Sequence, residues 1–78
     1  MALKELVAIV ARALVDDPDG VDVQEIESEN MSVVELKVAK DDIGKVIGKE
    51  GRTAQSIRAL LSAASAKIGR RSQLDIID

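Results

Sequence analysis

The chain of 78 residues contains no phenylalanine, tyrosine or tryptophan, and it also contains no cysteine and no histidine. Without aromatic rings it cannot belong to the modules that read RNA by stacking bases on aromatic side chains. Without cysteine and histidine it has no disulfide framework, no zinc site and no Cys/His nucleophile. We therefore expect no metal, no cofactor and no catalytic residue.

Long hydrophobic runs are also missing. The sequence has no apolar stretch of about 18 residues, which a membrane-spanning helix needs. Residues 1–15 lack the charged start and the small-residue cleavage site of a signal peptide. We therefore expect a soluble cytoplasmic protein without membrane contact. The hydrophobic fraction of 46% allows one small domain over residues 1–78, with a core of valine, isoleucine, leucine and alanine.

Charge is divided unevenly along the chain, although the net charge is only −3. Residues 1–35 carry two cations against nine acids, a net charge of −7. Residues 37–74 carry nine cations against three acids, a net charge of +6. Such asymmetry indicates that the basic segment contacts a polyanion. The nine cations are Lys37, Lys40, Lys45, Lys49, Arg52, Arg58, Lys67, Arg70 and Arg71.

The first half of the chain predicts one helix and a hairpin. Apolar residues at helical spacing predict a helix from Leu3 to Leu14, which the turn residues 16–20 end. A strand is predicted within residues 21–29, where a break in alternation at Ile26 indicates a bulge or a strand beginning at Val23. A turn at Asn30 leads to a second strand around Val34–Val38, antiparallel to the first.

The second half predicts two helices and a last strand. Asp41 or Asp42 caps a helix that runs to Ile47, a longer helix runs from Arg52 to Ile68, and a strand covers residues 73–77. A right-handed crossover makes the last strand parallel to the second. The predicted fold is therefore α+β, in the order helix, strand, strand, helix, helix, strand, with a three-stranded mixed sheet covered by three helices.

The most specific motif lies at the corner between the two later helices. Gly48 and Gly51 enclose Lys49 and Glu50, and Arg52 follows directly. Glycine allows a left-handed backbone and a close approach of another chain. The N–H groups and the positive dipole end of the helix that starts at Arg52 point into this corner. These features predict a site for a phosphodiester backbone.

The run Ile43-Gly44-Lys45-Val46-Ile47-Gly48-Lys49-Glu50-Gly51-Arg52, followed by Ile57, resembles the signature of KH domains. The element order resembles the type II form of that fold. With its short length and its Asp-Pro-Asp turn after the first helix, the chain is similar to the KhpA family of small bacterial RNA-binding proteins. The resemblance implies an RNA chaperone or post-transcriptional regulator rather than an enzyme. It also implies a homodimer, a larger partner of the Jag/KhpB type, and a role in cell elongation, division and peptidoglycan homeostasis.

The resemblance also implies which residues contact single-stranded RNA. The loop contacts the sugar-phosphate backbone, and bases lie in a groove floored by Ile43, Val46, Ile47 and the edge of the Val34–Val38 strand. Lys40 and Arg58 are candidates for the rim of this groove, whereas Arg70 and Arg71 lie far from it. The implied RNA-binding residues are Ile43, Gly44, Lys45, Ile47, Gly48, Lys49, Glu50, Gly51 and Arg52. Glu50 departs from the family pattern. Its carboxylate lies in the loop that contacts phosphate, and it repels phosphate.

Two other functions compete with RNA binding. The first is a KH fold kept as a protein–protein dimerisation module with weak or no RNA binding. Glu50, the acidic first half and the alanine-rich last helix favour it, and the interface expected on that helix comprises Ile57, Leu61 and Ala64. The second is a nucleotide-handling enzyme. Only three residues separate Gly44 from Gly48-Lys49, and a glutamate follows, so a Walker A loop is excluded.

Overall fold

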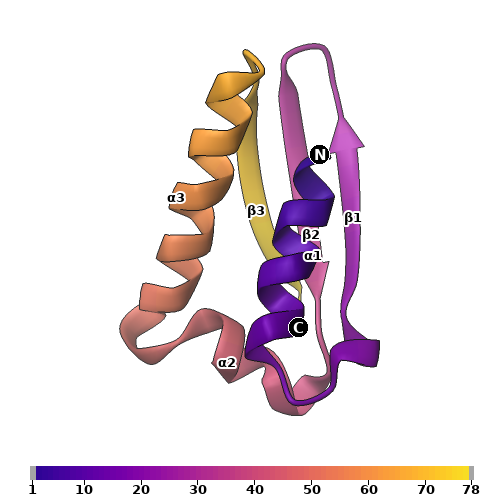
Figure 1. The fold of residues 1–78 in the computed structure, drawn as a ribbon, viewed down its shortest axis with the longest axis vertical. Helices are drawn as coiled ribbons and strands as arrows, with labels where there is room; N and C mark the ends of the chain where they lie inside the picture. The colour runs from indigo at the N-terminus through magenta and orange to yellow at the C-terminus, as the bar shows by residue number, and fades with distance from the viewer. Residues whose placement is uncertain (1, 78) are drawn as a thin grey trace.

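The computed structural model describes residues 2–77 and has the expected element order (Figure 1). Three short 3₁₀ turns, η1 to η3, lie between the longer elements. The elements are α1 (Leu3–Leu14), η1 (Pro18–Gly20), β1 (Asp22–Glu27), β2 (Met31–Lys37), η2 (Lys40–Asp42), α2 (Ile43–Ile47), η3 (Lys49–Gly51), α3 (Arg52–Lys67) and β3 (Arg71–Ile77).

The three strands form one mixed sheet in the order β1-β2-β3. β1 is antiparallel to β2, and β3 is parallel to β2, as the crossover through α2 and α3 predicts. Val34 in the middle of β2 is therefore paired with Glu25 on one side and with Leu74 on the other. The prediction that the Val34–Val38 strand offers an edge to a ligand was wrong, because β2 is the central strand.

The helices cover one face of this sheet (Figure 1). Val34, Leu36 and Val38 alternate toward the helices and are buried, whereas Val33 and Glu35 face the other side. The pairing of β1 with β2 is regular from Asp22 to Glu27, without the bulge that the sequence suggested. Ile26 lies on the uncovered face and is 53% exposed. This explains the break in alternation, since Val23 lies on the opposite face of the same strand.

The hydrophobic core is built from aliphatic side chains that come from every layer of the fold. α1 contributes Leu3, Val7 and Ala11, and each of them is less than 5% exposed. α2 contributes Val46, and α3 contributes Ile57 and Leu61, of which Leu61 is 1% exposed. Burying side chains of this size contributes roughly 1.5–3 kcal/mol each. A chain without aromatic residues therefore still builds a continuous core.

A polar contact network joins the end of α3 to the β1–β2 hairpin. The Arg70 guanidinium donates from Nε to Ser32 Oγ at 3.0 Å and from Nη2 to the carbonyl oxygens of Ser28 and Met31, each at 2.9 Å. Ser65 Oγ is hydrogen-bonded to Ser72 Oγ at 2.9 Å. Arg70 therefore fixes the turn that leads into β3, far from the glycine loop, as the sequence placed it.

Candidate nucleic-acid interface

The loop between α2 and α3 has a backbone that ordinary residues rarely adopt. Gly48, Glu50 and Gly51 all have positive φ angles, of 76°, 57° and 74°. A side chain at Gly48 would overlap the side chain of Thr53 and would come within 2.9 Å of the Thr53 nitrogen. Gly51 has open space around it, so only its positive φ angle requires a glycine at this position. The two glycines thus hold the sharp corner that the sequence predicted.

The N-terminus of α3 opens directly onto this corner. No side chain caps the helix at Gly51, although the backbone N–H groups of Gly51 and Arg52 donate to the carbonyl oxygens of Gly48 and Lys49 within the loop. Helix α3 has 16 residues, long enough for its dipole to favour an anion at this end. The exposed Lys49 and Arg52 add two positive charges. Arg52 also contacts Glu50, with Nη2 3.5 Å from Oε2 in a pair that is mostly exposed.

A shallow groove begins beside α2, on the side where β2 and β3 end. It has a volume of about 530 Å³, and its lining is mainly apolar with two lysines. The lining residues are Lys37, Val38, Lys40, Ile43 and Ile77. Sequence reasoning placed Ile43, Lys40 and, through the Val34–Val38 strand, Val38 here, and it missed Ile77 and Lys37. The predicted parallel crossover could have indicated Ile77, because it brings the end of β3 beside the end of β2.

Gly44 lies in α2 and is exposed, and a Cβ atom there would find nothing within 4 Å. Its φ angle is also ordinary for a helix. Glycine costs a helix about 1 kcal/mol relative to alanine. Neither a positive φ angle nor internal packing requires glycine at position 44.

The apolar residues of α2 divide between the core and the surface. Val46 is completely buried and belongs to the core, so the prediction that it floors the groove was wrong. Ile43 is partly buried against the core, and Ile47 is 38% exposed. Contacts with α1 and α3 set the rotation of this short helix about its axis. This rotation determines which of its apolar side chains are buried and which are exposed.

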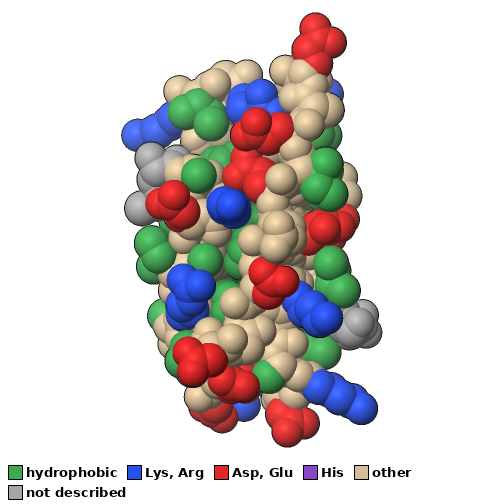
Figure 2. Space-filling model, turned by 90° about the vertical axis from the view of Figure 1, so that its right-hand side faces the viewer, with side chains coloured by type: hydrophobic (Ala, Val, Ile, Leu, Met, Phe, Trp, Pro, Cys, Tyr) green, Lys and Arg blue, Asp and Glu red, His purple; other side chains and the backbone are tan. Residues whose placement is uncertain are grey.

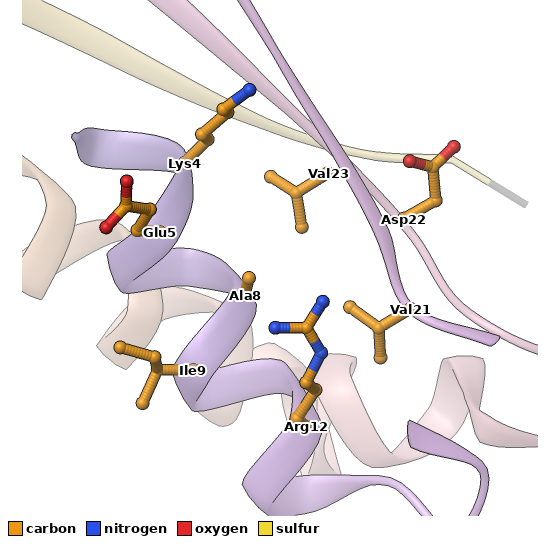
Figure 3. A pocket seen from close by; sticks show the side chains of 8 residues that line it. All are labelled: Lys4, Glu5, Ala8, Ile9, Arg12, Val21, Asp22 and Val23. Atoms are coloured by element: carbon orange, nitrogen blue, oxygen red, sulfur yellow. The ribbon is translucent and has the colours of Figure 1, made fainter. Parts of the chain in front are cut away.

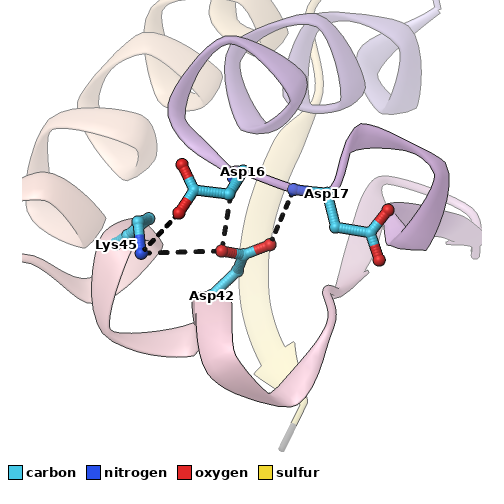
Figure 4. Close-up of polar contacts among 4 residues, drawn as sticks. All are labelled: Asp16, Asp17, Asp42 and Lys45. Carbon is cyan, nitrogen blue, oxygen red and sulfur yellow. Dashed lines mark hydrogen bonds and ion pairs between the residues drawn. The ribbon is translucent and has the colours of Figure 1, made fainter.

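Two carboxylates lie beside the Lys45 ammonium group (Figure 4). Its Nζ lies 3.2 Å from Asp16 Oδ2 and 3.7 Å from Asp42 Oδ1. The hydrogen bond and charge of Asp16, together with the charge of Asp42, raise the pKa of Lys45 above its ordinary value of 10.5. Lys45 therefore ties the segment after α1 to the start of α2.

Asp42 has a structural role that the sequence did not reveal. The sequence predicted it or Asp41 as the cap of the helix, yet Asp42 makes no side-chain cap bond to α2. Instead its carboxylate, which is buried, accepts hydrogen bonds from the backbone N–H groups of Asp16 at 3.3 Å and Asp17 at 3.1 Å (Figure 4). Asp42 thus sets the position of α2, and with it the position of the glycine loop.

The expected interface residues on α3 need a correction. Ile57 and Leu61 are 3% and 1% exposed and pack in the monomer core, so they cannot form a free surface. Ala64 is half-buried. The apolar side chain that α3 exposes near its middle is Leu60, at 52%, and small residues flank it on the outer side.

Within residues 2–77, no group of histidine, cysteine, aspartate or glutamate side chains could hold a metal ion, and no helix is long and apolar enough to cross a membrane.

The family model and the curated relatives agree on the family. The model of the family described as KhpA/KhpB, KH domain, matches residues 4–76. A relative from Caldanaerobacter subterraneus subsp. tengcongensis, named RNA-binding protein KhpA, is 53% identical over 94% of this chain and 97% of its own length. A protein of the same name from Aquifex aeolicus is 48% identical over 99% of this chain and 98% of its own length.

Solved structures of Era share the fold. A crystal structure of Aquifex aeolicus Era matches with a TM-score of 0.67 and 22% identity, over 95% of this chain and 29% of that chain. A structure of Era in complex with MgGDPNP and nucleotides 1506–1542 of 16S ribosomal RNA matches with a TM-score of 0.68 and 24% identity, over 95% of this chain and 28% of that one.

The type II KH architecture expected from the sequence is thereby confirmed, and so is the expectation of a non-catalytic protein, because this is a family of RNA-binding proteins. The chain belongs to the KhpA/KhpB family of KH-domain proteins.

Proposed function

We propose that this protein binds single-stranded RNA, with the glycine loop gripping the sugar-phosphate backbone. The observation that carries the proposal is the uncapped N-terminus of α3, which opens onto a loop with glycine at both corners. Amide donors and a positive helix end together form an anion site, and a backbone without side chains lets a phosphodiester approach. The name shared by the curated relatives, RNA-binding protein KhpA, supports RNA as the polyanion.

In this proposal, Lys49 and Arg52 add charge at the phosphates, and the bases enter the groove beside α2. Ile43 and Ile77 offer apolar contacts to base faces. Gly44 lets a base lie directly against the helix backbone, which accounts for a glycine that the monomer does not need. Lys45 is assigned to positioning α2, since its charge is already paired with Asp16 and Asp42.

Replacing Lys49 and Glu50 together by Asp tests the proposal. We expect RNA binding to be lost, because the charge of the loop changes by two units while the glycines stay. Fluorescence anisotropy with a labelled single-stranded RNA measures the affinity, and circular dichroism checks the fold.

The matched control is Lys67→Asp, which makes the same change of net charge on an exposed residue of the last turn of α3. Unchanged affinity of the double variant with a normal circular dichroism spectrum would sink the proposal. Equal losses in both variants would show that only the overall charge matters.

We further infer that the protein pairs, either with a second copy or with a KH domain of the Jag/KhpB type. The exposed Leu60 and the small side chains around it on α3 support an apolar interface near the loop. The family model, which covers the KH domains of both KhpA and KhpB, supports the second partner. Two linked loops gain effective concentration for one RNA strand.

The alternative is a dimerisation module with weak or no RNA binding, and the carboxylate of Glu50 in the loop supports it. The same anisotropy experiment decides, since this alternative expects weak or no binding by the parent protein and no further loss in the loop double variant.

We further propose that the protein regulates transcripts after transcription and that it acts in the cytoplasm. A role in cell elongation and peptidoglycan homeostasis stays a prediction from the family resemblance, and complementation with the loop double variant tests it.

A further inference from the structure

A second groove lies between α1 and β1 (Figure 3), on elements that the proposed RNA site does not use. Its volume is about 400 Å³. Ala8, Val21 and Val23 supply apolar surface, and the first two are buried while Val23 is half-buried. Figure 2 views the molecule from the β1 side, where acidic, basic and apolar side chains are interspersed. The groove therefore has a built apolar floor rather than a bare charged surface.

Two cations point into this groove. Lys4 and Arg12 extend from α1 toward β1, so that the Arg12 guanidinium lies between Ala8 and Val21 (Figure 3). Among residues 2–77 neither side chain takes part in an ion pair. The two acids of the lining, Glu5 and Asp22, point away from the groove (Figure 3).

A third acid near the groove, Glu25 of β1, is already occupied. Its Oε1 accepts a hydrogen bond from the backbone N–H of Lys4 at 3.0 Å, at the N-terminus of α1. Within the described residues Lys4 and Arg12 have no ion-pair partner, although the Glu25 carboxylate keeps its negative charge beside the backbone of Lys4. The groove has apolar contacts to offer and two positive charges without partners.

The other wall of the groove is the free edge of the sheet. β1 pairs with β2 on one side, and within the described residues no strand pairs with its other side (Figure 1). The backbone groups that point outward from Asp22–Glu27 are thus available to an added strand. A groove between a helix and an edge strand is the geometry in which proteins bind extended peptides by adding a strand to the sheet.

The spacing of the two cations defines the peptide. Lys4 and Arg12 are eight residues apart on one helix, roughly 12 Å along its axis. Four residues of an extended strand cover about 13 Å, and residues i, i+2 and i+4 share one face. We propose that this groove binds an extended segment of a partner protein with the pattern acidic–x–apolar–x–acidic, which pairs with β1 and places its carboxylates at Lys4 and Arg12.

The structure and sequence favour a different protein over a second copy or RNA. No segment of this chain has acidic residues four apart with an apolar residue midway between them. RNA gains its affinity from many phosphate contacts, whereas this groove offers the two cations Lys4 and Arg12. The intervening x residues face Asp22 and its neighbours on the outer side, so neutral or basic residues suit those positions.

A capped nine-residue peptide tests this proposal, with Glu at positions 3 and 7, Val at position 5, and Thr or Lys elsewhere. We expect binding in the micromolar range and slower hydrogen exchange at the backbone amides of residues 22–27. The Arg12→Glu variant should weaken binding at least about tenfold, because a charge-assisted contact becomes a repulsive one. Its matched control is Lys67→Glu on the last turn of α3, which should bind the peptide normally.

A second peptide, with Gln in place of both Glu residues, separates charge recognition from nonspecific strand addition and should bind at least tenfold more weakly. Failure of the first peptide to bind at millimolar concentration, or equal binding to the parent and Arg12→Glu, overturns the proposal. A loss of RNA affinity in Arg12→Glu, but not in Lys67→Glu, would overturn it in favour of a second nucleic-acid contact. Lys4 and Arg12 take no part in the proposed RNA site, so this test and that of the loop fail independently.

Discussion

Glu50 is a residue that neither the backbone conformation of the loop nor the proposed ligand favours. Its φ angle of 57° is uncommon for a residue with a long side chain, and its carboxylate lies beside the proposed phosphate site. We expect Glu50→Asn to bind RNA about threefold more tightly. Removing one repulsive charge at roughly 6 Å in a water-like medium is worth about 0.7 kcal/mol, and asparagine accepts the left-handed conformation well.

Titration of the parent and Glu50→Asn with the same labelled RNA measures this change. The control is Glu29→Gln, which removes an equal charge from the exposed hairpin between β1 and β2. A gain of the same size in the control would assign the effect to net charge, and weaker binding by Glu50→Asn would mean that the carboxylate itself contacts RNA.

The contacts of Lys45 with Asp16 and Asp42 make the free energy of unfolding depend on pH in the alkaline range. Asp16 and Asp42 raise the pKa of Lys45 in the folded protein above 10.5, so the charged form favours folding. This contribution is fully present below about pH 10 and is lost as the pH rises through the folded-state pKa. We expect urea unfolding to show Lys45→Gln less stable than the parent at pH 9, and this difference to shrink at pH 11.5. A constant difference would mean that Lys45 stabilises the corner through packing alone.

At the scale of elements, α3 shows where sequence reasoning reached its limit. Ile57, Leu60, Leu61 and Ala64 all fall within one broad face of the helix, so spacing alone does not decide which edge of that face meets the sheet. Contacts with α1 and β3 set the roll of the helix, and they bury Leu61 while leaving Leu60 exposed. The existence and length of the helix could be read from the sequence, but which of its apolar residues stay exposed could not.

The two leucines therefore make a matched pair. We expect Leu60→Asp to fold normally and to sediment as a monomer at micromolar concentrations where the parent sediments as a dimer, because a carboxylate is costly in an apolar interface. Leu61→Asp should fail to fold, since it places the same carboxylate in the core. Analytical ultracentrifugation and circular dichroism measure both outcomes. A parent that is already monomeric, or a Leu60→Asp variant that still dimerises, would rule out this face of α3.

At the scale of the whole molecule, the fold could be predicted further than the site. The order of elements and the mixed sheet could be predicted from helical spacing, the turn at residues 16–20 and the crossover rule. Each of these three signals depends on a local sequence pattern or on the handedness of the chain. The groove could not be placed, because it depends on which strand is central and on where β3 ends relative to α2. Asp42 is the clearest case, since its partners at Asp16 and Asp17 are more than twenty residues away.

The charge distribution of the whole molecule fixes how RNA affinity responds to salt. Arg70 is engaged with the hairpin and Lys45 with its carboxylates. Of the remaining cations, Lys49, Arg52 and the lysines of the groove lie at the proposed site, where we expect them to neutralise two or three phosphates. For single strands this predicts a slope of log affinity against log salt of about −1.5 to −2, or about 8- to 16-fold weaker binding between 50 and 200 mM salt. Anisotropy titrations across this range measure the slope. A slope steeper than about −4 would extend the basic surface well beyond the loop, whereas the acidic first half of the chain should confine it to the corner between α2 and α3.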